Sequence, residues 1–425
     1  MRVHDKSMVE SEMHACLRHT MRLSRWAGVF CVSGLDKSTF RELRCNVKSV
    51  YFIMNIISLI VQFILMVTCM DRMTYKFNVN FITMFMFYLT TTLTTSFLLK
   101  LAWDWPKLIK KTTMIEQCFA PIRTTRNNPR KFLAVSCFVT VMAIVEHALC
   151  VNFRIQHIML CLGETRVDAK LLQKYISETL SLIFQYTAPD LWKTILYEIF
   201  DFQASFVWNF TDVITMCASM YLSSHFRDLN GYIEKETKRG SPNWAQIRIH
   251  YSYLVKLVNV VDSKLCYLIL LSYFSNVYYI CNQMFFATNR FVTLADSACK
   301  QEAIIRTINS KAYKIYYLYS FFFLLHRFFM MSTFAVNVNI EALKPLKALR
   351  DVPSEEYNVE VQRFIHQLRH SITALSGVFF YITKGMILNV IGTIITYELV
   401  LLQFSRQKTV AWTDRHNHTS YFYAF

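Results

Sequence analysis

The stretch VYFIMNIISLIVQFILMVTCM at residues 50–70 contains no Asp, Glu, Lys or Arg. A helix that crosses a membrane needs roughly 20 mostly apolar residues, because hydrocarbon cannot satisfy exposed backbone polar groups. Residues 78–99 and 265–287 are similarly long and equally free of these charges. The three stretches therefore predict membrane-spanning helices.

Four further apolar stretches include isolated ionisable residues, namely 132–151 with Glu146, 202–222 with Asp212, 315–335 with Arg327, and 378–404 with Lys384 and Glu398. Together with the first three they predict an all-α membrane protein with seven transmembrane helices. Ionisable groups in such helices are costly and mark functional positions. Residues 175–200 carry several charges and Pro189, and they instead predict two surface helices that break at the proline.

The chain combines 54% hydrophobic residues with a formal net charge of +17. An excess of basic residues indicates either nucleic acid or a membrane surface as partner, and this hydrophobicity favours the lipid bilayer. With a cytoplasmic N-terminus, the inside segments hold about twice as many Lys and Arg residues as the outside segments, as membrane proteins prefer. We therefore predict that the N-terminus is cytoplasmic and the C-terminus extracellular. The glycosylation sequon at residues 417–419 in the final tail agrees with this.

Polar and aromatic residues gather near the predicted outer ends of four spans. They are Glu146, His147, Asp201, Gln203, Trp208, Tyr278, Asn282, Gln283, Tyr316 and Tyr319. Carboxylates and amides can replace water on hydroxyl groups, and flat rings can cover C–H faces. The mixture predicts an outward-facing pocket for a polyhydroxylated ligand. The alternative is that these side chains bond between helices or form an interfacial aromatic belt.

The last predicted span carries a polar stripe at helical spacing. Its members are Asn389, Thr393, Thr396, Val400 and Gln403. The stripe is either a packing seam within one chain or, if copies surround a symmetry axis, the lining of a water-filled path. In the second case Val400, Gln403 and Phe404 close the path outward. Glu398 then either attracts cations or bonds within the wall.

The sequence contains no Walker A loop, GxSxG elbow or HExxH motif, so we expect no enzyme, no cofactor and no metal site. His366 and His370 are interpreted as part of a solvated helix face. A G-protein-coupled receptor would have an extracellular N-terminus, which makes that class the least favoured. A secondary transporter for a small polar solute remains an alternative, because Asp212, His326 and Arg327 lie near mid-depth, although no internal repeat is evident.

Residues 396–404, TYELVLLQF, match a Thr-Tyr, five mainly hydrophobic residues, Gln-Phe signature. This ending, on a seven-span chain with its N-terminus inside, resembles the insect gustatory receptor family. Further segments resemble the sugar-receptor branch of that family: VWNFTD at 207–212, IRIHY at 247–251, ILLS at 269–272, YICNQ at 279–283, VPSEEY at 352–357 and ALSG at 374–377.

The resemblance implies a multi-pass plasma-membrane receptor that acts as a sugar-gated, non-selective channel for monovalent and divalent cations. Family members assemble as tetramers, in some cases with related co-receptors, and the last helix of each subunit lines the pore. The pore closes at the end of the signature, here Gln403 and Phe404. The expected organisation is a cytoplasmic segment 1–49, six helices with the ligand pocket over 50–335, a cytoplasmic anchor region 336–377, the pore-lining helix 378–404 and an extracellular tail 405–425.

Overall fold

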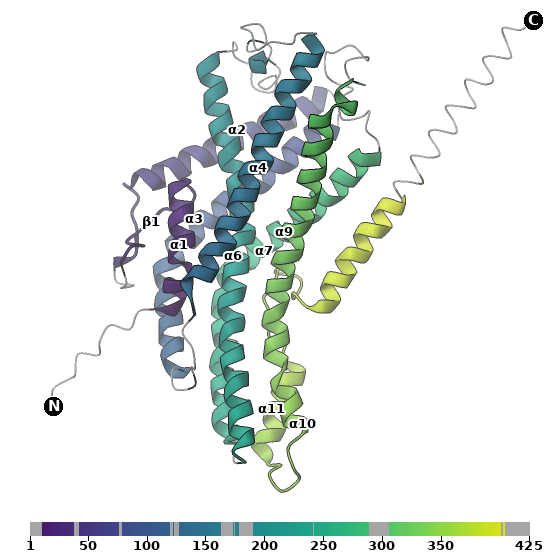
Figure 1. Ribbon diagram of the computed structural model, residues 1–425. Helices are drawn as coiled ribbons and strands as arrows, with labels where there is room; N and C mark the ends of the chain where they lie inside the picture. Colours follow the sequence, from purple (N-terminus) through teal and green to yellow (C-terminus); the bar gives the residue numbers. More distant parts are fainter. Residues whose placement is uncertain are drawn as a thin grey trace, which may run out of the picture.

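Long α-helices make up most of the molecule (Figure 1). The computed structural model describes residues 11–37, 42–75, 79–119, 122, 127–162, 173, 175–177, 190–240, 242–288, 306–400 and 403. Its elements are α1 (Glu12–Trp26), β1 (Val32–Ser33), β2 (Arg44–Cys45), α2 (Val50–Tyr75), α3 (Val79–Phe119), α4 (Pro129–Leu162), α6 (Leu191–Lys238), α7 (Trp244–Thr288), α9 (Lys311–Leu343), α10 (Pro345–Arg350) and α11 (Val359–His370). A final helix covers residues 384–400, and residue 403 is also helical.

Polar side chains mark where several helices begin. The Ser310 hydroxyl accepts a hydrogen bond from the backbone N–H of Tyr313 at 3.2 Å at the start of α9. The Asn358 side chain caps α11 in the same way, accepting from two backbone N–H groups. Such caps satisfy backbone donors that have no partner within the helix. α4 begins at Pro129, which fits a first helical turn because that position needs no backbone donor.

Helices α6 and α7 form an antiparallel pair that extends well beyond one bilayer. α6 has 48 residues and α7 has 45, or about 70 Å each, whereas the hydrocarbon core is about 30 Å thick. Their lower ends lie with the end of α9, α10 and α11 (Figure 1). There Arg248 of α7 forms an ion pair with Glu360 of α11 at 2.7 Å. The amide of Asn230 in α6 donates to the backbone carbonyl of Glu341 in α9 at 3.0 Å.

Within the described residues, four helical segments are long and apolar enough to cross a membrane: Val50–Thr74, Asn80–Phe119, Pro129–Cys161 and Lys311–Arg350. They contain four of the seven predicted spans. α6 and α7 contain two more of the predicted spans and are longer than a bilayer requires. The structure thus shows a helical membrane protein, while the count of seven spans and the placement of both termini stay predictions.

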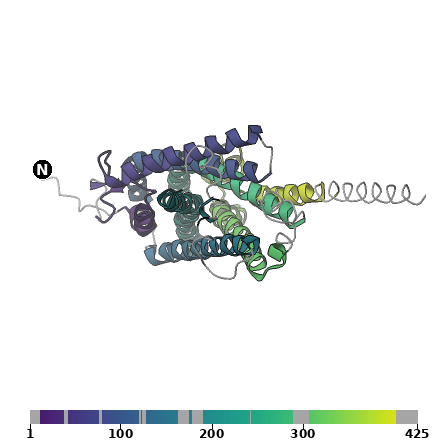
Figure 2. The same cartoon turned by 90° about the horizontal axis from the view of Figure 1, so that it is seen from above.

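Two boundaries predicted from the sequence are wrong. Residues 191–200 do not form a separate surface helix, because α6 begins at Leu191 and continues through them. The last helix begins at residue 384 rather than 378, because residues 375–382 form a tight turn. The helix then leans away from the rest of the molecule, as the yellow ribbon shows in the view from above (Figure 2). The tail at 405–425 lies outside the described residues.

The N-terminal region packs against the helical bundle. The carboxylate of Glu116 in α3 accepts hydrogen bonds from the backbone N–H groups of Glu12 and Met13 at 3.0 Å, and so caps α1. Strands β1 and β2 pair antiparallel. The pairing brings the thiol sulfurs of Cys31 and Cys45 to 3.3 Å, and both cysteines are free.

Candidate ligand-binding cavity

A cavity of about 440 Å³ lies between α3, α4, α6, α7 and α9. Its lining residues are Thr83, Met84, Phe87, Tyr88, Glu146, His147, Cys150, Phe153, Arg154, Tyr197, Asp201, Ser205, Trp208, Tyr279, Asn282, Gln283, Phe286, Tyr313, Tyr316, Tyr317, Ser320, Phe323, Leu324 and Arg327. Ligand sites of this size are usually apolar with a few placed polar groups. This cavity is richer in charge than that pattern.

One wall is a hydrogen-bonded chain across three helices. The Ser320 hydroxyl of α9 donates to Glu146 Oε1 of α4 at 2.7 Å and accepts from the Gln283 amide of α7 at 3.0 Å. Gln283 Oε1 is buried and has no hydrogen-bond partner among the described residues. A buried acceptor without a partner is costly, so a ligand hydroxyl that donates to it would be favoured.

A second wall places two tyrosines and an arginine around Asp201 of α6. The Tyr88 hydroxyl donates to Asp201 Oδ1 at 3.2 Å and lies 3.1 Å from the hydroxyl of Tyr197. The guanidinium of Arg154 in α4 lies 3.9 Å from Asp201 Oδ2 and 3.7 Å from a carboxylate oxygen of Glu198. The Asp201 charge is therefore compensated, and the wall still offers several hydroxyl and carboxylate oxygens.

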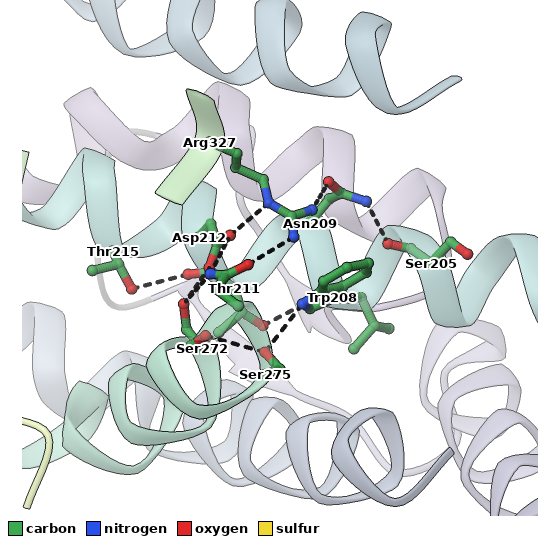
Figure 3. A network of polar contacts seen from close by, with 11 residues as sticks. Ser205, Trp208, Asn209, Thr211, Asp212, Thr215, Ser272, Ser275 and Arg327 are labelled. Atoms are coloured by element: carbon green, nitrogen blue, oxygen red, sulfur yellow. Dashed lines mark hydrogen bonds and ion pairs between the residues drawn. The ribbon is translucent and has the colours of Figure 1, made fainter. Parts of the chain in front are cut away.

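The floor of the cavity is a buried network around Arg327 of α9 (Figure 3). The Arg327 Nε atom lies 2.8 Å from Asp212 Oδ2. The two terminal nitrogens of Arg327 donate to the amide oxygen of Asn276 at 2.9 Å and to that of Asn209. Asp212 also accepts from the Asn276 amide and from the Ser272 hydroxyl. A buried charge pair is tolerated only when such additional bonds satisfy it, and here α6, α7 and α9 all contribute.

Aromatic rings cover the remaining surface. The Arg327 guanidinium carbon lies 4.1 Å from the centroid of the Trp208 ring. The Trp208 ring centroid lies 4.9 Å from that of Tyr279, and the indole N–H donates to Ser275 Oγ at 3.1 Å. Phe153 of α4 and Tyr316 of α9 stack with centroids 5.5 Å apart. The cavity therefore combines flat apolar faces with oxygen acceptors and hydroxyl donors.

Seven of the ten ligand residues expected from the sequence line this cavity: Glu146, His147, Asp201, Trp208, Asn282, Gln283 and Tyr316. The other three lie elsewhere. Gln203 turns to the N-terminal region, where its amide donates to the Gly28 carbonyl at 3.1 Å. Tyr319 donates to the Met142 carbonyl at 3.0 Å between α9 and α4. Tyr278 faces a second cavity on the other side of α7. That the seven bind a ligand stays a prediction.

Several cavity residues give no clear signal in the sequence. Arg154 lies just beyond the predicted end of the span at residues 132–151. Tyr88 and Ser320 are uncharged residues within apolar stretches, and no spacing pattern in the sequence marks them as ligand residues. Arg327 was noticed as a charge within a span, but its position at the cavity floor follows only from the packing of α9 against α6.

The predicted pore residues lie on the final helix, where Asn389, Thr393, Thr396, Val400 and Gln403 are all exposed. The hydroxyls of Thr393 and Thr396 donate to their own helix backbone at 2.9 Å. Glu398 is buried on another face, and Phe404 lies outside the described residues. An exposed polar stripe fits either interpretation of it, so the pore assignment stays a prediction.

The second cavity, of about 860 Å³, separates the final helix from α7. Its walls are mainly apolar and include Phe274, Val277 and Tyr278 of α7 and Val390 of the final helix. Asn282 lines both cavities, so α7 is the partition between them. Among the described residues, no group of three or more His, Cys, Asp or Glu could hold a metal ion.

Comparison of the whole chain with known protein families identifies a family of receptors. The model of the trehalose receptor family matches residues 3–413. The chain belongs to this family. Trehalose receptor relatives in Drosophila melanogaster include gustatory receptor 5a for trehalose, which is 28% identical over 392 residues that cover 90% of this chain and 83% of that one. Gustatory receptor for sugar taste 64b is 27% identical over 417 residues, covering 93% and 96% of the two chains.

The expected membership of the sugar-receptor branch of insect gustatory receptors is thus confirmed, and with it the expectation that this trehalose receptor family member is a receptor and not an enzyme. The solved structure of the insect olfactory receptor OR5 from Machilis hrabei in complex with eugenol has a similar fold, with a TM-score of 0.59 at 14% identity over 91% of this chain and 97% of that one. A second solved structure of OR5 from Machilis hrabei gives a TM-score of 0.56 at 14% identity, over 91% of this chain and 97% of that one.

Proposed function

We propose that the protein is a sugar-gated, non-selective cation channel in the plasma membrane. The observation that carries the proposal is the cavity of about 440 Å³, in which Glu146, Asp201, Asn282 and Gln283 face the rings of Trp208 and Tyr316. Carboxylates and amides bond sugar hydroxyls, and rings cover the C–H faces. Family membership supports a sugar as the ligand, since relatives are named for trehalose and sugar taste.

The final helix is the proposed pore lining in a tetramer. Its polar stripe is exposed in the single chain. Asn389 and Thr393 border the second cavity beside α7, and in the proposed tetramer the rest of the stripe faces copies of itself around an axis. Cations pass along this shared path, and Gln403 and Phe404 close it. Sugar and ion share no site, so sugar must open the pore by binding the open state more tightly than the closed state.

The proposed orientation has one further support. Cys161, at the end of α4, is in a disulfide bond, and disulfides persist on the oxidising side of a membrane. The end of α4 is the outer end in the orientation with a cytoplasmic N-terminus, and Glu146 and Arg154 of the same helix line the cavity. In this orientation a sugar from outside the cell would therefore reach the cavity directly.

A transporter would need a substrate path through one subunit. The floor of the cavity is occupied by the Arg327 and Asp212 network, and Phe328 and Met331 of α9 are fully buried next to it along the helix. This packing favours a binding site over a passage. One experiment distinguishes the transporter from the channel, on cells that express this chain with and without a related co-receptor. The channel predicts a sugar-evoked cation current without uptake of labelled sugar, whereas sugar uptake without such a current would establish the transporter.

A further inference from the structure

The final helix leaves the bundle from a tight turn at residues 375–382. The backbone N–H of Ile382 donates to the Leu375 carbonyl at 2.9 Å, and the N–H of Gly377 donates to the Phe380 carbonyl at 2.8 Å. Val378 has a φ of 68°, a left-handed conformation that a β-branched residue adopts only when its surroundings impose it. The turn is therefore held in a defined, strained shape.

Close packing reinforces this shape. A Cβ atom added at Gly377 would overlap the ring of Phe380, so a larger residue at this position requires that ring to move. Segments of two other helices hold the preceding residues. The Asn339 amide of α9 donates to the Thr373 carbonyl at 3.2 Å, and the hydroxyls of Tyr251 and Thr373 lie 3.2 Å apart.

The strongest attachment is a single carboxylate on α7. Asp262 Oδ1 accepts a hydrogen bond from the backbone N–H of Ser376 at 2.6 Å, and its Oδ2 accepts from the Ser376 hydroxyl at 2.7 Å. Hydrogen bonds to a charged acceptor are roughly twice as strong as neutral ones. One side chain of α7 thus holds both donors of one residue in the turn.

The same helix reaches the ligand cavity without interruption. α7 runs from Trp244 to Thr288 and carries Asp262 near its middle and Asn282 and Gln283 at the cavity. These positions are about 30 Å apart at 1.5 Å per residue. A continuous helix between two attachment points moves as one element, so a shift of α7 at the cavity also shifts the turn that Asp262 holds.

We propose that Asp262 is a positioning residue of the pore helix: it ties the turn at 375–382 to α7, so that the base of the final helix follows α7 when the cavity contracts around a ligand. The inference rests on the proposed function, since it needs a ligand-gated final helix. In this inference the Asp262–Ser376 contact couples the ligand cavity to the final helix and does not itself contribute to ligand binding.

The test records sugar-evoked current and measures labelled-sugar binding to the tetramer in the same membranes, each normalised to surface protein. Asp262→Ala removes both hydrogen bonds, and we expect the maximal current to fall about fivefold or more while saturable sugar binding remains. Ser376→Ala removes one bond and should lower the maximal current about threefold. Ser376→Thr keeps the hydroxyl and the N–H, and should restore the wild-type current. Glu234→Ala, an exposed carboxylate on α6, is the matched control.

The outcomes separate the inference from the function on which it rests. If wild-type receptor gives no sugar-evoked current, the proposed function and the inference both fail. If wild type conducts and Asp262→Ala or Ser376→Ala keeps its full maximal current, only the inference is overturned. Loss of sugar binding together with current would show a structural role and would also overturn it. Should Asp262→Ala not reach the surface, the comparison of Ser376→Ala with Ser376→Thr decides the question.

Discussion

The guanidinium carbon of Arg327 lies 4.1 Å from the centroid of the Trp208 ring. The contact joins α9 to α6 at the floor of the ligand cavity, where Asp212 balances the arginine charge. A cation over an indole face is attracted electrostatically, and more strongly when both are removed from water. Trp208 therefore has one face held by the protein, which fixes the orientation of its ring beside the cavity.

The ion pair of Arg327 and Asp212 predicts a specific pattern of stability. Arg327→Met leaves Asp212 buried without its cation and should lower the free energy of unfolding by about 3–5 kcal/mol. The double variant Arg327→Met/Asp212→Leu removes both charges and should recover much of that loss. Thermal unfolding of the receptor in lipid nanodiscs measures both. A double variant no more stable than the single one would show that the charge pair is not the source of the effect.

Asp201 is predicted to affect sugar activation and not ion selectivity. Asp201→Asn weakens the hydrogen bond from Tyr88 and leaves Arg154 less well compensated, so the sugar concentration for half-maximal current should rise about tenfold. The reversal potential in mixed cations should stay unchanged. Glu198→Gln is the control, because Glu198 also faces Arg154 but does not line the cavity. A shift in the reversal potential would mean that Asp201 belongs to the ion path.

Phe404 is predicted from the sequence to close the pore. Phe404→Ala removes the ring that keeps the closed path dry, and a current without sugar should appear. Leu402→Ala, which lies off the polar stripe, should stay closed at rest. Whole-cell recording of each variant before sugar is added gives the comparison. A silent Phe404→Ala receptor with normal surface expression would contradict this gate.

The cysteine pair in the N-terminal region gives a test of the fold that is independent of channel activity. Burial, with the hydrogen bond to Cys45, raises the pKa of the Cys31 thiol to about 12. Only the thiolate reacts with maleimides, so at neutral pH Cys31 should react at least about a hundredfold more slowly than the exposed thiol of Cys118. Site-resolved mass spectrometry after timed labelling in detergent gives the two rates, and the Cys31 rate should increase when the pH is raised slightly above neutral. Equal rates at neutral pH would show that the β1–β2 pairing is not formed.

The apolar stretches predicted the helices well, because backbone groups in lipid leave few other structures available. The same stretches predicted that Glu146, Asp201 and Gln283 lie near one end of their helices, and all three line the cavity. The direction of a side chain around a helix did not follow. Gln203 and Tyr319 lie on the same helices as cavity residues but face other neighbours. A helix that is apolar on all sides shows no hydrophobic stripe that would indicate its rotation.

The start of the final helix was missed for a different reason. Residues 378–383 are mostly apolar and continue the pattern of the helix that follows. The turn there depends on the left-handed backbone of Val378 and on Asp262, which lies more than a hundred residues earlier in the chain. A contact between positions so far apart leaves no local signal in a single sequence.

The side chain of Asn282 belongs to the walls of two cavities that differ in chemistry, one rich in charge and hydroxyl groups and one mainly apolar beside the final helix. A water-soluble molecule and a lipid-soluble molecule would thus meet the same amide from opposite sides. Their effects on the receptor would be linked through one residue even though the two molecules share no chemistry, and competition between them need not mean a shared site.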